Sequence, residues 1–536
     1  MKSKEKIIIS GVLLIAIMAA IQVIYTTRWG LVAGSDSAVY LAAARNLLKG
    51  DGLQILLPSG NPATLMPPLY SLALSALGGL NLDILQAARW LNAVLFLITI
   101  LFSGLVVVFF CRSSWLALPA SLIIALYPII LYQYSSMMTE PLFLAFVMIC
   151  MFLFLQYLEI GKSKWIIAAG LITGLLTLTR FIGYVLFPVG IIITFLNIRV
   201  GLKRRLVDIL SFVMAYSIPV LIWLVWFHYN PDASPMLGRP LWTNPWEYLA
   251  PVRSGMVSVL WNGLPFSDQL PIKAKLLRFD ILIGLAMIWS CATLWSAIRL
   301  FGKRLSVWVT DRDMRLIILS GLFFLCYVFG FIFVYLFRLP TQDVNARTLL
   351  PLFPTIILML IGSLSLYFRS AKGMGRKLIY MFSAFLLIGI CSGYLKDNIP
   401  LMKNLHDNGG GYSSPVWQYS KTIQNLSQIS PEMKIISNDT GAVLFFTNRS
   451  ALEFKQSFDK LSTTEFTRYG NETLDDAQQL FHDRQAVLVL FTPSLFWQLE
   501  PVFQDQTQER INLLLGGLEK VSETSDGGIY LYPIQP

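Results

Sequence analysis

The chain has 536 residues, of which 55% are hydrophobic and only 14% are charged. A soluble domain carries about 25% charged residues, so the composition excludes an ordinary soluble protein and indicates a polytopic membrane protein. The net charge of +11 would suggest a nucleic-acid partner in a soluble protein. Here the basic residues lie between apolar runs, which assigns them to membrane topology and predicts no nucleic-acid partner.

Eleven apolar runs approach the length of about 20 residues that a membrane-spanning helix needs. The first run follows MKSKEK and is longer than the apolar region of a typical signal peptide, so we expect a retained span. The pair 165–179 and 181–198 fits either two short tilted spans or one broken span. The eleven runs lie at about 7–25, 90–111, 115–132, 137–158, 165–179, 181–198, 207–227, 279–298, 315–337, 348–368 and 378–395.

Lys and Arg are distributed unevenly between the loops. With the N-terminus inside the cell, the inner loops contain 19 Lys and Arg in 49 residues, and the outer loops contain 12 in 130. Cytoplasmic loops carry an excess of these residues. We therefore predict a multi-pass protein of the plasma or inner membrane, with a cytoplasmic N-terminus and an extracytoplasmic segment from about residue 396.

The first outer loop, 26–89, contains two helical patterns. In 37–49 the apolar residues Tyr40, Ala44, Leu47 and Leu48 fall on one helix face, and a second helix is expected at 67–80. Amphipathic helices beside a span are suited to lie in the membrane interface. We expect this loop to pack on the membrane face.

Asp36 stands just before the first of these helices, in the sequence SDS. Two roles are open, and they are compatible. A short polar side chain before a helix is typical of an N-cap. A carboxylate at the boundary between water and membrane is also suited to act as a general base.

Glu140 lies at the start of the fourth apolar run, in SSMMTEPLFLAF. An acid there either reaches water at the end of the span or faces the bundle interior, where an ionisable residue is a hypothesis for a functional site. The Glu-Pro pair is also typical of a helix start, with Thr139 as the cap and Pro141 in the first turn.

Arg180 interrupts two apolar runs, and Arg347 lies just before the tenth run. Each is either a residue that extends its charge to the interface or a ligand for phosphate, because a guanidinium presents forked donors that match phosphate oxygens. The outer loop 228–278 between them is rich in Pro and Trp. Its Trp242, Trp246 and Tyr248 are predicted interfacial anchors.

The last 141 residues, 396–536, have an ordinary soluble composition and predict a small α/β domain. We expect helices at 415–429 and 474–484. The transmembrane region is then 1–395. The strand-like runs are Lys434–Ile436, Ala442–Phe446, Ala486–Phe491 and Gly528–Tyr532.

The sequence signals no metal site. The five cysteines lie in or beside apolar runs, and the three histidines are far apart, so neither a disulfide framework nor a zinc site is predicted. No acidic cluster demands a metal. We expect no required cofactor, and a role for a divalent metal stays open.

Five stretches together resemble the polytopic GT-C glycosyltransferases, which include the dolichyl-phosphate-mannose–protein mannosyltransferases and the lipid A aminoarabinose transferases. DSAVYLAAARNLLKGDGL, followed by PPLYSLALSAL, is similar to their first extracytoplasmic loop. Three further landmarks follow in the family's order: TEPLF at 139–143, LTLTR at 176–180 and ARTLLPLFP at 346–354. The resemblance implies a GT-C like membrane region of about eleven spans.

The resemblance also implies an activity. Such enzymes pass a hexose or pentose from a polyprenyl-phosphate carrier to a lipid, glycan or protein acceptor at the outer face, usually with inversion. It assigns Asp36 as the catalytic base, Glu140 as a second acid near the active site, and Arg347, with Arg180 as a helper, to the carrier phosphate. The catalytic region is then 1–395, and we expect the C-terminal domain to contribute to acceptor choice or stability.

The chain also departs from the mannosyltransferases. Ser37 follows Asp36 where that branch has a second acid, and no His precedes the PP pair. A mannose donor and a protein acceptor are therefore not supported. Two other classes stay open: a transporter or flippase of a lipid-linked substrate, and a receptor whose tail binds a ligand.

Overall fold

The computed structural model describes residues 3–53, 66–229, 275–302, 305–337, 346–453, 485–492 and 518–531, with a few shorter pieces between them. Trp242, Trp246 and Tyr248 lie outside the described residues, as does nearly all of the helix predicted at 474–484.

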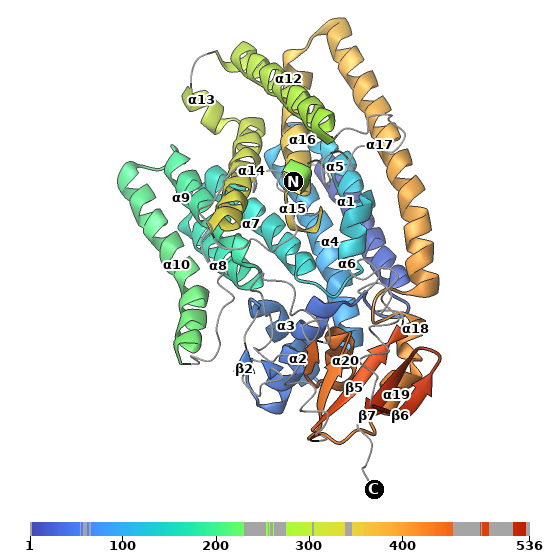
Figure 1. The fold of residues 1–536 in the computed structure, drawn as a ribbon. Helices are drawn as coiled ribbons and strands as arrows, with labels where there is room; N and C mark the ends of the chain where they lie inside the picture. The colour runs from blue at the N-terminus through green and yellow to red at the C-terminus, as the bar shows by residue number, and fades with distance from the viewer. Residues whose placement is uncertain are drawn as a thin grey trace.

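A large helical body makes up most of the described chain (Figure 1). Each of the eleven predicted runs coincides with helical structure, so the prediction of a helical polytopic membrane protein is confirmed. The helices of this body are α1 (Ser3–Thr26), α4 (Ile84–Phe110), α5 (Ala117–Leu126), α6 (Pro128–Tyr134), α7 (Glu140–Ile160), α8 (Ser163–Thr179), α9 (Leu186–Leu196), α10 (Leu202–His228), α12 (Lys275–Phe301), α14 (Arg312–Phe337), α16 (Leu352–Ser370) and α17 (Gly373–Asn408). The short helices α13 (Leu305–Thr310) and α15 (Ala346–Leu349) lie before α14 and α16.

Among the described helices, eight are long and apolar enough to cross a membrane. The segment Ser114–Leu126, which includes α5, and the helix α6 meet at an angle of 65°. If these two pieces together form one broken span, the described helices provide nine spans. The bend falls at Pro128, because a proline disfavours the helical conformation of the residue before it, and Tyr127 is extended there. The helices α8 and α9 are shorter, so their crossing stays a prediction.

The short helix α8 is held by a close approach to α10. A Cβ added at Gly170 would lie 2.5 Å from the Phe212 carbonyl oxygen, and one at Gly174 would lie 2.6 Å from that of Tyr216. Two glycines four residues apart let helix backbones approach closely in a membrane. This spacing fixes α8, and with it the following residue Arg180.

Both helices predicted in the first loop are present, as α2 (Ser35–Lys49) and α3 (Leu69–Gly79). Between them lies a two-stranded ribbon of β1 (Ile55–Leu56) and β2 (Pro62–Ala63). Tyr40, Leu41 and Ala44 of α2 are buried. The helix is therefore part of the protein core and does not rest on the membrane surface alone.

The C-terminal region contains the small mixed sheet expected of an α/β domain, in the order β4-β3-β5-β7-β6. The strands β4, β3 and β5 are parallel, and β7 and β6 are antiparallel to their neighbours. The helix α17 continues past residue 396 to Asn408, so the membrane region passes into this domain without a linker. The elements are α18 (Pro415–Gln418), α19 (Lys421–Leu426), β3 (Lys434–Ser437), α20 (Thr440–Thr447), β4 (Ala451–Glu453), β5 (Ala486–Phe491), β6 (Glu519–Thr524) and β7 (Gly527–Leu531).

The strand predicted at Ala442–Phe446 is wrong, because this run lies inside the helix α20. Asp439 caps that helix by accepting a hydrogen bond from the Ala442 N–H at 2.9 Å. The helix joins the parallel strands β3 and β4, and parallel strands need a crossover, which a helix usually provides.

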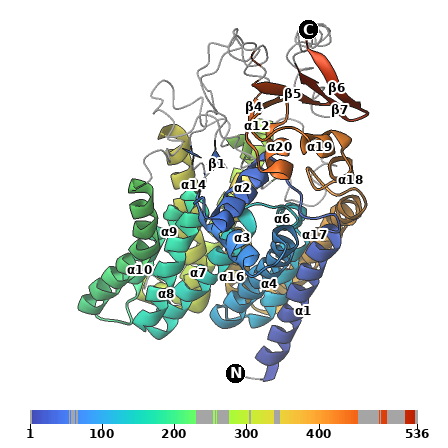
Figure 2. The ribbon, with the colours of Figure 1, turned by 90° about the horizontal axis from the view of Figure 1, so that it is seen from below.

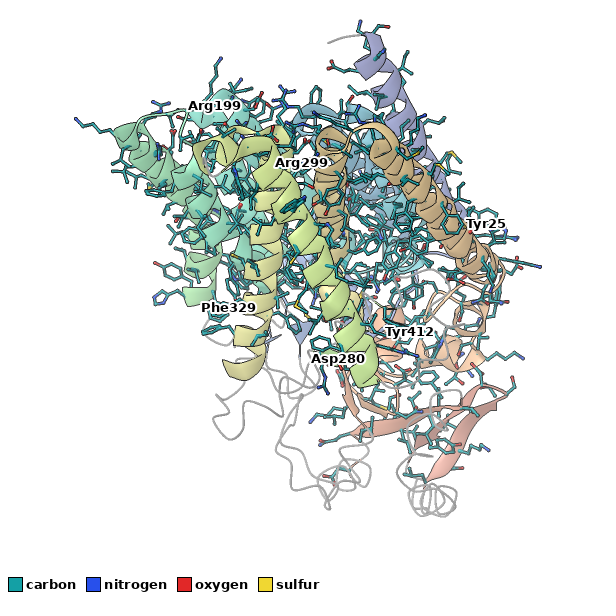
Figure 3. The ribbon with its side chains drawn as sticks, turned by 90° about the horizontal axis from the view of Figure 1, so that it is seen from above. Tyr25, Arg199, Asp280, Arg299, Phe329 and Tyr412 are labelled. Atoms are coloured by element: carbon teal, nitrogen blue, oxygen red, sulfur yellow. The ribbon has the colours of Figure 1, made fainter. Side chains whose placement is uncertain are left out.

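The first-loop helices and the sheet lie at the same end of the helical body (Figures 1 and 2). Arg199 and Arg299 lie towards the opposite end, far from Tyr412 beside the sheet (Figure 3). Among the described residues, the first-loop helices and the C-terminal sheet therefore share one end of the helical body.

The approach of α8 to α10 leads to a prediction about stability. Gly170→Ala places a methyl group against a backbone oxygen that cannot turn away, and we expect it to lower the free energy of unfolding by about 1–3 kcal/mol. The control is Gly389→Ala in α17, where an added Cβ meets no described atom within 4 Å and which should be neutral or stabilise by up to ~1 kcal/mol. Thermal unfolding of the two purified proteins in detergent checks this. Equal midpoints would contradict the close approach.

Candidate active site

The four charged residues singled out from the sequence meet in one cluster. Arg347 on α15 donates from Nη1 to Asp36 Oδ2 at 2.9 Å. It also donates from Nε to Glu140 Oε1, and Arg180 donates from Nη1 to the same oxygen. These residues come from four separate segments of the chain. The structure thus brings all of them together, while their individual roles stay predictions.

The two carboxylates differ in exposure. The Glu140 side chain is 1% exposed, whereas that of Asp36 is 35% exposed. A buried carboxylate is stable only when paired, and Glu140 is paired with two arginines. Glu140 therefore anchors the arginines, and Asp36 is the more exposed acid.

Arg347 joins the two acids. Burial disfavours its charged form, but the charges of Glu140 and Asp36 outweigh this effect and raise the pKa of Arg347 above its ordinary value. Its guanidinium stays positive at every physiological pH. The side chain is 27% exposed, and its ion pairs with the described carboxylates use Nε and Nη1.

The interpretation of Asp36 as the helix cap is wrong. Gly34 is the N-cap of α2, and the Ser37 hydroxyl accepts a hydrogen bond from its N–H at 3.0 Å. Asp36 lies within the first turn, where the N-terminal end of a helix favours a negative charge. Its carboxylate is directed to Arg347 and not to the backbone.

Glu140 begins α7, with Pro141 in the first turn as the sequence indicated. Thr139 occupies the cap position, but its hydroxyl bonds Glu140 Oε2 at 3.4 Å and caps no backbone N–H. The carboxylate therefore starts a helix and also faces the interior. The alternative that it reaches water is excluded by its burial.

A backbone pairing places the two acids side by side. Val32 donates from its N–H to the Ser135 carbonyl at 2.8 Å and accepts at its own carbonyl from the Met137 N–H at 2.9 Å. The result is a parallel bridge between Val32 and Ser136. Asp36 follows Val32 by four residues, and Glu140 follows Ser136 by the same interval.

Buried polar side chains hold the 134–136 segment in place for this pairing through hydrogen bonds. Asn92 of α4 donates to the carbonyls of Tyr134 and Ser136, at 3.0 and 2.8 Å. The Thr26 and Ser135 hydroxyls lie 2.7 Å apart. The sequence analysis did not identify these residues. Each is a polar residue in or beside an apolar run, which is visible in the sequence, but the sequence does not show which group it bonds.

Three buried tyrosines lie near enough to the cluster to interact with the charge of Glu140: Tyr40, Tyr70 and Tyr327. Tyr327 donates from its hydroxyl to the Thr348 carbonyl at 2.6 Å and so holds the backbone next to Arg347. Burial raises the pKa of Tyr40 and of Tyr70, and the nearby charge of Glu140 raises both further. Both phenols stay protonated and do not act as bases.

Metal binding finds no support in the part of the chain that the structure describes. There, no group of three or more His, Cys, Asp and Glu side chains stands close enough to hold an ion. The expectation that no cofactor is required stays a prediction.

Comparisons with known proteins confirm the resemblance to GT-C enzymes. Residues 84–232 match the family described as dolichyl-phosphate-mannose-protein mannosyltransferase. No curated protein matches the chain by sequence.

Among solved structures, the chain is similar to ArnT from Cupriavidus metallidurans bound to undecaprenyl phosphate, with a TM-score of 0.56 and 13% identity over 98% of both chains. It is also similar to the apo state of that protein, with a TM-score of 0.54 and 13% identity over 98% of this chain and 99% of the other. At this identity the likeness establishes the fold, which extends over the membrane region and the C-terminal domain.

The anchoring role of Glu140 can be tested by stability. Glu140→Ala leaves Arg180 and Arg347 without their shared partner, and breaking a buried pair costs about 3–5 kcal/mol. Asp36→Asn, at a partly exposed position, should cost about 1 kcal/mol or less. Thermal unfolding in detergent compares the two variants. A loss for Glu140→Ala that does not exceed the loss for Asp36→Asn would contradict the assignment.

Proposed function

We propose that this protein is a glycosyltransferase that moves a sugar from a polyprenyl-phosphate carrier to a hydroxyl of a lipid, glycan or protein at the outer face of the membrane. The observation that carries the proposal is the accessible carboxylate of Asp36 paired with Arg347 at 2.9 Å. The fold adds support, since it is shared with ArnT, one structure of which contains undecaprenyl phosphate.

In the proposed reaction the acceptor oxygen attacks the anomeric carbon of the donor sugar. The bond between that carbon and the phosphate oxygen breaks, and its electron pair leaves with the polyprenyl phosphate. Asp36 takes the proton of the acceptor hydroxyl, which is work typically worth about 10²–10⁴-fold in rate.

Arg347 would hold the carrier phosphate. A guanidinium has five N–H donors, and the two ion pairs engage only its Nε and Nη1 nitrogens. A phosphate on the remaining donors would place a fixed positive charge beside the leaving group, where charge develops in the transition state. Arg180, held by Glu140, adds positive potential behind it. With two arginines in place the scheme requires no metal.

The donor would also release Asp36 from its ion pair. Arg347 pairs with Asp36 at 2.9 Å. A phosphate that competes for Arg347 would loosen this pair. The Asp36 carboxylate would then be able to accept from the acceptor hydroxyl when the donor is bound, which couples deprotonation of the acceptor to the presence of the sugar.

Asp36→Asn tests the general base. We expect transfer from a polyprenyl-phosphate sugar to fall by about 10²–10⁴-fold while the protein stays folded, measured with purified protein in liposomes. Wild-type transfer rates in this variant would overturn the assignment. If the wild-type protein moves the carrier between leaflets without cleaving the sugar–phosphate bond, the protein is a transporter and the proposal fails.

Arg347→Lys tests the phosphate ligand. Lysine keeps the charge but loses the fork that matches phosphate oxygens, so we expect the KM for the donor to rise about tenfold, equivalent to ~1.4 kcal/mol. The control is Arg376→Lys in α17, where the arginine bonds the Ala371 carbonyl at an exposed position. Unchanged donor KM in Arg347→Lys would contradict the role.

A further inference from the structure

The C-terminal domain forms hydrogen bonds with the segment that leads into α2. The Tyr412 N–H donates to the Ala33 carbonyl at 2.9 Å, and the Ser413 hydroxyl donates to the Leu31 carbonyl at 2.6 Å. A parallel bridge joins Ala33 to Gly411. The segment before Asp36 is therefore held on one edge by the residues that lead to Glu140 and on the other by the C-terminal domain.

Gly411 is required for this contact in two ways. Its φ of +53° lies in the left-handed region, which L-residues with a side chain rarely adopt. A Cβ at this position would also overlap the carbonyl oxygen of Ala33. The close backbone pairing therefore depends on the absence of a side chain.

The helix α20 lies along α2 and contacts both of its ends. Near its start, Gly441 packs on Ser35, since an added Cβ would lie 3.1 Å from the Ser35 Cα. At its other end, Arg45 donates from Nη1 to the Phe445 carbonyl at 2.7 Å. The Asn448 side chain donates to Asn46 Oδ1 at 3.0 Å.

The contact of Arg45 has a clear physical origin. The last carbonyls of a helix have no intrahelical donor, and the C-terminal end of a helix favours a positive charge. Phe445 is in the last turn of α20. Its carbonyl is thus a suitable acceptor for a guanidinium, and the bond ties the third turn of α2 to the domain.

We propose that the C-terminal domain positions Asp36, with Gly411, Gly441 and Arg45 as positioning residues. The proposal rests on the function proposed above. The cluster of Asp36, Glu140, Arg180 and Arg347 contains no residue of the domain, yet the domain holds the segment and the helix that carry Asp36. Glu140 lies on α7, outside the segments that the domain contacts through Gly411, Gly441 and Arg45, so a shift of α2 changes the distance of Asp36 from Arg347 and from the acceptor. Displacement of a catalytic group by 1 Å can cost about 10²-fold in rate.

The test compares two glycines of nearly equal backbone conformation. Gly411 has a φ of +53° and Gly373 has a φ of +56°, but an added Cβ at Gly373 meets no described atom within 4 Å. The two alanine variants therefore share the backbone strain and differ in the clash with Ala33. We expect Gly411→Ala to lower kcat by about 10–100-fold with donor KM changed less than about twofold, and Gly373→Ala to retain both.

A second readout needs no activity. Hydrogen–deuterium exchange should rise in 31–49 of Gly411→Ala, but not in 140–160, and Gly373→Ala should leave both segments unchanged. Unchanged exchange in 31–49 overturns the proposal that the C-terminal domain holds this segment. Raised exchange with a normal kcat overturns its link to Asp36. If the wild type transfers no sugar, the function proposed above fails, and exchange alone still decides whether the domain holds α2.

Arg45 provides a variant for the case that Gly411→Ala does not fold. Arg45→Ala removes the bond to α20 at a site remote from the reacting atoms, and we expect a loss of kcat in the same direction. Arg45→Lys keeps a charged donor and should recover part of it. Equal kcat in Arg45→Ala and the wild type would overturn the role of Arg45.

Discussion

The candidate site depends on one interaction, the pairing of the buried Glu140 carboxylate with two arginines. A lone charge in the low-dielectric interior is costly, and a matched pair is stable only with good geometry and full hydrogen bonding. Arg180 and Arg347 both donate to the same Glu140 oxygen, so neither arginine is placed independently of the other. Asp36 joins the cluster through Arg347. The accessible acid is thus linked to the buried one through a shared arginine.

The division between a buried and an accessible acid explains why two carboxylates occur at one site. Glu140 and Asp36 contact the same guanidinium, but only Asp36 has a substantial exposed fraction. With two acids and two arginines the cluster is formally neutral, which limits the cost of keeping four charges at the end of a helical bundle. Under the proposed function, arrival of a phosphate would disturb this balance and couple donor binding to the release of Asp36 from Arg347.

Sequence patterns predicted those features that depend on local chemistry. The apolar runs, the helices α2 and α3, and the four charged residues were all found, because length, periodicity and charge in an apolar context are visible in the chain itself. Two predictions were wrong for different reasons. Ala442–Phe446 is a short apolar run without a period, and it forms the helix that crosses from β3 to β4 and is capped by Asp439. Asp36 does not cap α2, because Gly34 takes that position with the Ser37 hydroxyl on its N–H, and the Asp36 carboxylate pairs with Arg347, a partner distant in the chain.

The contact between the first loop and the C-terminal domain begins where the two helices that lead into them end. The helices α1 and α17 end side by side: the His406 Nδ1 donates to the Tyr25 carbonyl at 2.9 Å, and the two rings stack at 4.2 Å. The Trp29 indole then bonds the Asp407 carbonyl at 3.1 Å. Directly after these contacts, 31–34 and 410–413 pair through their backbones. The apolar face of an amphipathic helix can pack against many different surfaces. The sequence of such a helix alone therefore does not determine where it lies in the protein. The contacts between the ends of α1 and α17 therefore fix where the first loop begins, and this position determines where α2 and Asp36 lie.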